Sequence, residues 1–247
     1  MTVRLEIVSA EDWADRVADE LVDRVRKRPS LRLCLPSGDT PTALFARLVR
    51  RSAAGDVSFE GVTIVLLDEF LGLAPDDPAR CDVRLGRELL GTLRPKPAAI
   101  HTIDVDAADP AAAARAHDAV AAAGLDLVLL GLGMNGHIGL NEPGSGPDSP
   151  TRVVTTAASS QIAALERYGA ATAPVKGITL GMNRLLAARE IWLLVTGPRK
   201  AGVLARALHG PEGEDCPGSY LRRHPRLWVI ADEPAAAKLG FPRSHWG

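Results

Sequence analysis

Short apolar runs alternate with amphipathic stretches along most of this chain, and this alternation restricts the fold more than any other feature. The apolar runs predict buried strands at residues 31–35, 62–67, 125–130, 190–196 and 227–231. Shorter extended pieces are expected at 100–103 and 152–155, and helical periodicity predicts helices at 11–27, 41–53, 82–92, 110–123, 159–168, 182–188, 198–209 and 233–239. Strands separated by helices are typical of a parallel sheet joined by crossover helices. We therefore predict an α/β, Rossmann-like fold whose open, mostly parallel sheet carries helices on both faces.

The length of the chain indicates one domain. Its 247 residues are enough for a well-buried core but too few for two large ones, so residues 1–247 are expected to form a single domain. The one weak shift in composition is the stretch 143–150, which is rich in Pro, Gly and Ser. Long ordered loops in compact domains are usually functional, so we interpret this stretch as an active-site loop.

Charge and cysteine content favour a small-molecule partner. Lys and Arg total 29 against 30 Asp and Glu, which predicts no electrostatic attraction to nucleic acid or to an anionic membrane. The three cysteines are widely separated and fit neither a disulfide framework nor a metal site, as expected in a reducing cytosol. The sequence shows neither a signal peptide nor an apolar segment of membrane-spanning length. We expect a cytoplasmic location.

Two strand ends carry groups suited to an anion. Ligands of open parallel sheets bind beyond the carboxyl ends of the strands. After the strand at 31–35, Thr40 suits a helix N-cap and Pro41 the first helical position, so free N–H groups would face an anion such as phosphate. An ordinary helix cap is the alternative. After the strand at 190–196, Arg199 and Lys200 lie in the first turn of a predicted helix, where their positive charge interacts unfavourably with the helix dipole. A bound anion would make this arrangement favourable; a solvated surface pair is the alternative.

Asp68 follows the buried strand at 62–67 and is a candidate general base. Partial loss of solvent raises the pKa of a carboxyl group toward the range useful for proton abstraction. Glu69 is expected to point the other way, because successive side chains alternate in extended backbone. The alternative is that Asp68 caps a turn.

A glycine-rich loop at 131–143 follows the strand at 125–130. Its opening matches the G-x-G-x-x-G pattern of dinucleotide sites, but the later glycines and Pro143 break the helix that such a site requires. The other interpretation is that the loop wraps a substrate while His137 and Glu142 project into it. Imidazole changes charge near neutral pH, and a nearby carboxylate would fix its tautomer, so this pair is a candidate proton carrier.

These segments resemble a known family. Leu67-Asp68-Glu69-Phe70 and the loop from Gly133 to Pro143 resemble the two signature segments of glucosamine-6-phosphate deaminases. The resemblance runs from about Leu5 to the closing helix and includes 37–41, 177–181 and the Lys200 segment. The stretch 167–197 is also similar to galactosamine-6-phosphate deaminases, which leaves the sugar epimer open.

The resemblance implies roles for these residues. Asp68 would move a proton between C2 and C1 of the opened sugar, and His137 would carry the ring-opening proton with Glu142 orienting it. Asn135, where some relatives carry Asp, would hold His137 by hydrogen bonding. The phosphate would be held by Ser37, Gly38, Thr40 and Lys200. The product would be a ketohexose 6-phosphate plus ammonia, formed without cofactor or metal.

One residue of the phosphate loop departs from the family pattern. Asp39 stands where relatives usually have a small neutral residue, and a carboxylate beside a phosphate is repulsive unless it turns outward.

Two other functions remain as alternatives. A 6-phosphogluconolactonase would share the fold but is expected to lack an acid at position 142, so Asn141-Glu142-Pro143 favours the deaminase. A sugar-phosphate sensor that binds without turnover is the non-enzymatic alternative. The sequence also leaves open whether the chain is a monomer or a homo-oligomer.

Overall fold

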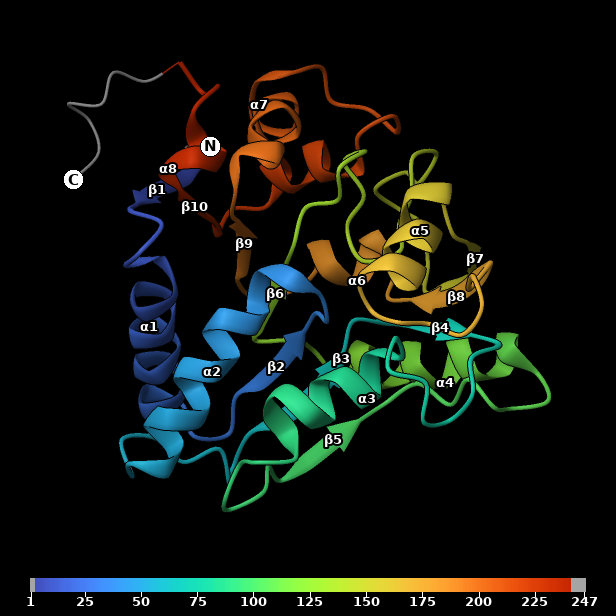
Figure 1. Ribbon diagram of the computed structural model, residues 1–247, viewed down its shortest axis with the longest axis horizontal. Helices are drawn as coiled ribbons and strands as arrows, with labels where there is room; N and C mark the ends of the chain where they lie inside the picture. Colours follow the sequence, from blue (N-terminus) through green and yellow to red (C-terminus); the bar gives the residue numbers. More distant parts are fainter. Residues whose placement is uncertain (1–2, 241–247) are drawn as a thin grey trace.

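The central sheet is parallel throughout. The structure, a computed structural model, describes residues 3–240. Seven strands lie in the order β1 (Arg4–Val8), β10 (Leu227–Asp232), β9 (Ile191–Val195), β6 (Leu127–Leu130), β2 (Arg32–Leu35), β3 (Thr63–Leu66) and β5 (Ala99–His101), and all neighbouring pairs run in the same direction (Figure 1). The predicted α/β architecture is confirmed. β1 was not predicted.

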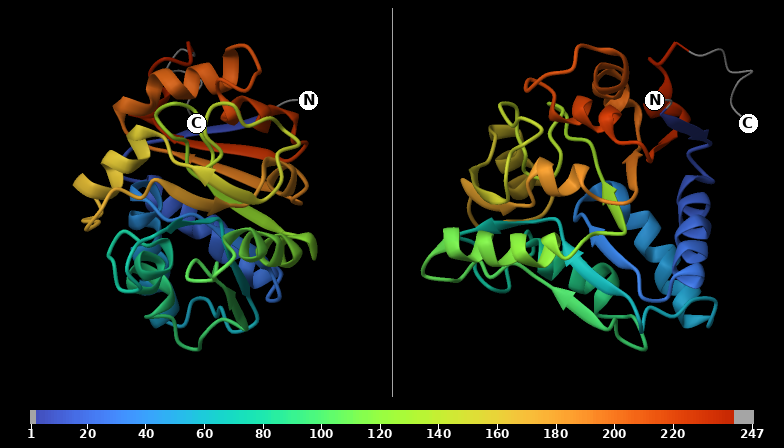
Figure 2. Two further views of the ribbon diagram at one scale, coloured as in Figure 1. Left: turned by 90° about the vertical axis from the view of Figure 1, so that its right-hand side faces the viewer. Right: turned by 180° about the vertical axis from the view of Figure 1, so that it is seen from behind.

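Helices cover both faces of this sheet. One face carries α1 (Trp13–Lys27), α2 (Asp39–Ala53), α3 (Cys81–Leu85) and a π-helical turn at Gly86–Leu90; the other carries α4 (Pro110–Ala122), α6 (Met182–Leu186), α7 (Ala201–His209) and α8 (Glu233–Ala236). Figures 1 and 2 show α1 and α2 on one side of the central strands and α4 on the other. Alternation along β2 explains this, because Leu33 and Leu35 pack against the first group and Cys34 against the second. In the described part of the chain, no helix is long and apolar enough to cross a membrane.

The chain reverses its direction of travel across the sheet between β2 and β6. From β2 it proceeds outward through β3 to β5, and from β6 it proceeds the opposite way through β9 to β10. Adjacent strands that feed connections in opposite directions leave a crevice at their carboxyl ends. The loops after β9, β6, β2 and β3 therefore gather at one end of the sheet.

A second, antiparallel sheet stands beside this crevice. It contains β4 (Asp68–Leu71), β8 (Lys176–Thr179) and β7 (Arg152–Thr155), with α5 (Ala158–Glu166) near it in Figure 1. β7 matches the predicted extended piece, whereas β4 and β8 were not predicted. Asp68 begins β4 and pairs with Thr179, so its backbone is held by a ladder of hydrogen bonds.

Most predicted helices differ from the structure by one to three residues at an end, and three of the helices differ in ways that matter here. α2 begins at Asp39, and Gly38 rather than Thr40 occupies the N-cap, with Thr40 and Pro41 inside the first turn. Gly38 has φ 139°, a conformation that favours glycine and lets the helix start earlier. The helix expected at 82–92 divides into α3 and the π-helical turn. The one expected at 198–209 is a 3₁₀ turn at Pro198–Lys200 followed by α7, and a further 3₁₀ segment spans Pro217–Arg223.

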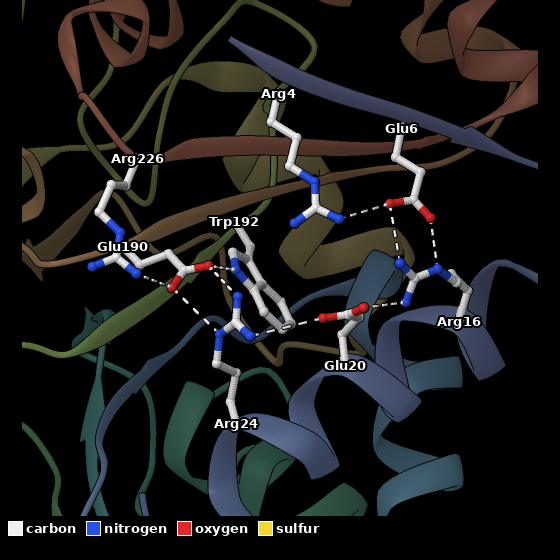
Figure 3. Close-up of polar contacts among 8 residues, drawn as sticks. All are labelled: Arg4, Glu6, Arg16, Glu20, Arg24, Glu190, Trp192 and Arg226. Carbon is white, nitrogen blue, oxygen red and sulfur yellow. Dashed lines mark hydrogen bonds and ion pairs between the residues drawn. The ribbon is translucent and has the colours of Figure 1, made fainter. Parts of the chain in front are cut away.

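A chain of ion pairs ties α1 to the sheet (Figure 3). Arg24 of α1 donates to Glu190 at 2.9 Å, and the buried indole N–H of Trp192 donates to the same carboxylate at 2.7 Å. Arg226 reaches Glu190 from the solvent side at 3.3 Å. Glu190 is thus the only acceptor for the Trp192 indole within residues 3–240.

Replacing Glu190 should therefore destabilise the fold. Glu190→Ala leaves a buried N–H without an acceptor and is expected to lower the free energy of unfolding by about 1 to 3 kcal/mol. Glu190→Gln, which keeps an oxygen acceptor, should lose less, and Arg226→Ala, at a side chain 64% exposed, should change it by no more than about 0.5 kcal/mol. Urea unfolding of the three variants checks the order; equal losses in the two alanine variants would contradict it.

Candidate active site

His137 and Glu142 form a hydrogen-bonded pair in the loop after β6. His137 Nδ1 lies 2.9 Å from Glu142 Oε2, which also accepts from Asn135 Nδ2 at 2.8 Å. Ser160 of α5 donates to the other carboxylate oxygen at 2.7 Å. Burial acts to raise the pKa of Glu142, but the hydrogen bonds and the charge of His137 hold it at about 2. Because an ionised carboxylate only accepts, the proton on Nδ1 points at Glu142 and Nε2 is left to exchange protons with a ligand.

Gly133 makes room for the imidazole. A Cβ atom at this position would lie 2.3 Å from His137 Nε2. The Gly133 N–H also donates to the His137 carbonyl oxygen at 3.0 Å, which closes the loop on itself. The backbone after Gly136 forms no helix, so the dinucleotide interpretation of this loop is wrong. Gly133 is therefore needed because the backbone passes close to the His137 side chain.

Asp68 lies at the same end of the sheet and is only 8% exposed. Burial raises its pKa from 3.8 to about 6, against the opposing effects of a hydrogen bond from the Cys81 thiol and the charge of His137. Cys81 Sγ is 3.6 Å from Asp68 Oδ1. Glu69 turns away as predicted, and its carboxylate accepts the N–H groups of Cys81 and Asp82 at the start of α3, at 2.8 Å each.

The loop between β2 and α2 presents free donors at the crevice. The N–H groups of Gly38, Asp39 and Thr40 have no acceptor among residues 3–240, and they lie at the positive end of α2. Ser37 sits at the start of this loop; burial raises the pKa of the Cys81 thiol, and the Ser37 side chain acts in the opposite direction. The geometry suits an anion, as the sequence indicated.

Lys200 and Arg167 bring positive charge to this loop. Lys200 is half-buried and donates to the Leu132 carbonyl, whereas Arg199 is exposed. Burial, together with the charge of Arg167, lowers the pKa of Lys200. Arg167 Nη1 donates to Asp39 Oδ2 at 2.9 Å. The sequence did not single out Arg167 as a site residue, because it follows α5 without any motif around it.

The cysteines take no part in a metal cluster in the described residues. All three are buried and free of disulfides. No group of three or more His, Cys, Asp or Glu side chains within residues 3–240 is placed to hold a metal ion.

The raised pKa of Asp68 predicts how stability depends on pH. The native state binds the Asp68 proton more tightly than the unfolded state, so this group makes stability fall as pH rises from about 4 to about 6. Asp68→Asn should therefore be more stable than the parent chain at pH 7, by roughly 1 to 3 kcal/mol, and no more stable near pH 4. Chemical denaturation across this range checks it. The exposed Asp76→Asn variant should show no such pH-dependent difference; a gain at Asp68 that is the same at both pH values would refute the assignment.

Sequence comparison places the chain among known proteins. Residues 7–229 match the family described as glucosamine-6-phosphate isomerases/6-phosphogluconolactonase. A glucosamine-6-phosphate deaminase of Shewanella loihica is 39% identical over 241 residues, covering 95% of this chain and 90% of the relative. One of Rhodopirellula baltica is 37% identical over 242 residues, covering 96% of each.

Solved structures agree with the sequence relatives. A monomeric glucosamine-6-phosphate deaminase superposes with a TM-score of 0.91 at 30% identity, covering 96% of this chain and all of that one. A 6-phosphogluconolactonase from Trypanosoma cruzi gives a TM-score of 0.76 at 20% identity over 97% of this chain and 98% of its own, a likeness of fold alone. With nearly its whole length matched, the chain belongs to the family of glucosamine-6-phosphate isomerases and 6-phosphogluconolactonases.

Proposed function

We propose that this chain is an enzyme that isomerises and deaminates a hexosamine 6-phosphate, releasing a ketohexose 6-phosphate and ammonia. The observation that carries the proposal is the pairing of a buried carboxylate of raised pKa, Asp68, with the His137–Glu142 couple at one end of the sheet, beside free helix N–H groups. Aldose–ketose proton transfer requires a base and a proton carrier, and the sugar phosphate requires an anion site. Relatives named glucosamine-6-phosphate deaminase support the same reaction.

Ring opening is assigned to His137. Its Nε2 would take the proton from O1 of the sugar and return it to O5, because Nδ1 is committed to Glu142. Asn135 contributes from behind: its Nδ2 donates to Glu142, and its Oδ1 accepts the His137 backbone N–H at 3.2 Å. Both the imidazole and its carboxylate partner are thereby held in one orientation.

Proton transfer between carbons is assigned to Asp68. With a pKa of about 6 it is mostly ionised at neutral pH, yet more basic than an ordinary aspartate. Moving the C2 proton to C1, while a proton of the amine passes to O1, converts the open-chain 2-amino aldose into the C2 imine of a ketose. Water adds to the C=N carbon, and ammonia leaves as the C2 carbonyl forms, which balances the reaction without a redox step.

Phosphate binding is assigned to Ser37, Gly38, Thr40 and Lys200, and we add Arg167. The backbone N–H groups of the loop offer directional donors, and the two cations supply charge.

We further propose a single domain over residues 1–247, of which 1–2 and 241–247 lie outside the described residues, and a cytoplasmic location. A homo-oligomer is also proposed, although one similar solved structure is that of a monomeric enzyme.

The substrate test separates the proposal from its alternatives. The purified chain should release equal amounts of ammonia and ketose phosphate from glucosamine 6-phosphate, with galactosamine 6-phosphate assayed in parallel to decide the epimer. Asp68→Asn and His137→Gln should each lower kcat by about a hundredfold or more while substrate still binds. Turnover of 6-phosphogluconolactone alone would favour the lactonase, and binding without turnover would favour a sensor.

A glycine substitution tests the placement of His137. Gly133→Ala puts a methyl group where the imidazole lies, so we expect kcat to fall at least about tenfold while the chain still folds. Gly131→Ala in the same loop is the matched control, because a Cβ there meets nothing within 4 Å. Ammonia release and far-UV circular dichroism are measured for both. Similar activity of the two variants would remove His137 from its assigned position.

A further inference from the structure

Arg84 is a buried cation whose carboxylate partners lie beyond hydrogen-bond distance. Its side chain is 5% exposed and its guanidinium lies 3.7 Å above the centre of the Tyr168 ring. Nη1 is buried with no hydrogen-bond partner, which makes Arg84 the only charged side chain within residues 3–240 with such an atom. Nη2 lies 3.6 Å from Glu88 Oε1 and 4.0 Å from Asp39 Oδ1, too far for hydrogen bonds. A buried guanidinium in this state is costly unless an acceptor arrives in some state of the protein.

Asp39 is the acceptor nearest the anion site. It stands in the first turn of α2, next to the free N–H groups, and its carboxylate currently binds Arg167 at 2.9 Å. Both side chains are about half exposed, 55% for Asp39 and 45% for Arg167. Exposed pairs of this kind are worth little, so Arg167 can leave at small cost. Glu88 is less available, since its other oxygen accepts the Thr42 hydroxyl at 2.9 Å.

Asp39 is unfavourable for a phosphate at this helix end for two reasons. The Asp39 carboxylate repels the phosphate, and it binds Arg167, the cation that the phosphate would otherwise bind. We propose that Asp39 changes partners when phosphate binds: Arg167 turns from Asp39 to the phosphate, and Asp39 turns to Arg84. This proposal rests on the proposed function only in naming a sugar phosphate as the ligand.

In the phosphate-bound state the exchange gives Arg167, Asp39 and Arg84 each a partner of opposite charge. A phosphate dianion attracts Arg167 more strongly than a single carboxylate does. Asp39 Oδ1 lies 4.0 Å from Arg84 Nη2 and needs to move only to hydrogen-bond distance to give the guanidinium a hydrogen-bonded carboxylate. Arg84 would then be a positioning residue that acts through Asp39, rather than a direct phosphate ligand.

Removing the carboxylate should tighten phosphate binding. Asp39→Asn frees Arg167 and removes the repulsion, so we expect the Kd of inorganic phosphate and the KM of the sugar phosphate to fall about fivefold. Titration calorimetry of the full chain measures the Kd. Asp15→Asn is the matched control. Asp15 lies on α1, is 53% exposed and, like Asp39, pairs with an arginine, Arg47, at 2.8 Å. An Asp39→Asn Kd that is unchanged or weaker overturns the proposal.

A double-mutant cycle isolates Arg84. Arg84→Met should weaken phosphate binding about fivefold in the parent chain, because Asp39 then has no second partner, but less than about twofold in the Asp39→Asn background. A structural role alone would not be rescued by Asp39→Asn. Equal losses in both backgrounds would make Arg84 a direct ligand and overturn the proposal. Arg84→Gln replaces the Met variant if urea unfolding shows that the latter does not fold.

Failure of this inference and failure of the proposed function are distinguishable. If the Asp39 and Arg84 variants change the Kd of inorganic phosphate as expected while no amino-sugar phosphate releases ammonia, the partner exchange stands and the proposed reaction is wrong. If ammonia is released but Asp39→Asn does not tighten phosphate, the reaction stands and the exchange is wrong.

Discussion

The parallel pairing of β2 with β6 is the constraint on which the rest of the site depends. Cys34 and Val128 face each other in this pair, and the connections that leave the two strands run in opposite directions. Because all strands of the sheet are parallel, the loop at 36–40 and the loop at 131–143 must emerge at the same end. β3 and β9 flank the pair and add Asp68 and Lys200 at that end. Residues more than a hundred positions apart therefore meet without any local motif to join them.

The pKa values of two carboxyl groups in this crevice are shifted in opposite directions by their surroundings. Asp68 has the Cys81 thiol as its hydrogen-bond donor, and burial dominates its pKa. Glu142 is half-buried, and it accepts hydrogen bonds from His137, Asn135 and Ser160, which keep it ionised. The pattern of hydrogen-bond donors, rather than depth alone, therefore separates the pKa values of the two carboxyl groups.

Much of this could be predicted from sequence, and the remainder depended on contacts that sequence does not encode locally. The long apolar runs at 62–67 and 190–196 were correctly assigned to strands because burial on both faces leaves a continuous signal. β8 was missed because its residues are buried by pairing with β4 and β7, which are distant in sequence. The start of α2 was predicted two residues too late, because Thr40 and Pro41 suggested a cap whereas Gly38, with its positive φ, is the N-cap. Arg84 and Arg167 carry no motif, so only the packing of α3 and α5 beside the loop reveals them.

The antiparallel sheet explains how a buried Asp68 can be tolerated at all. Placing a carboxylate where its charge is unfavourable works against folding, and without restraint the backbone would rotate the group into solvent. Pairing Asp68 with Thr179 in the β4–β8 ladder restrains the backbone, while Glu69, the next residue, is anchored by the N–H groups that open α3. The small sheet thus helps to hold the Asp68 carboxyl group in a buried position where its pKa is raised.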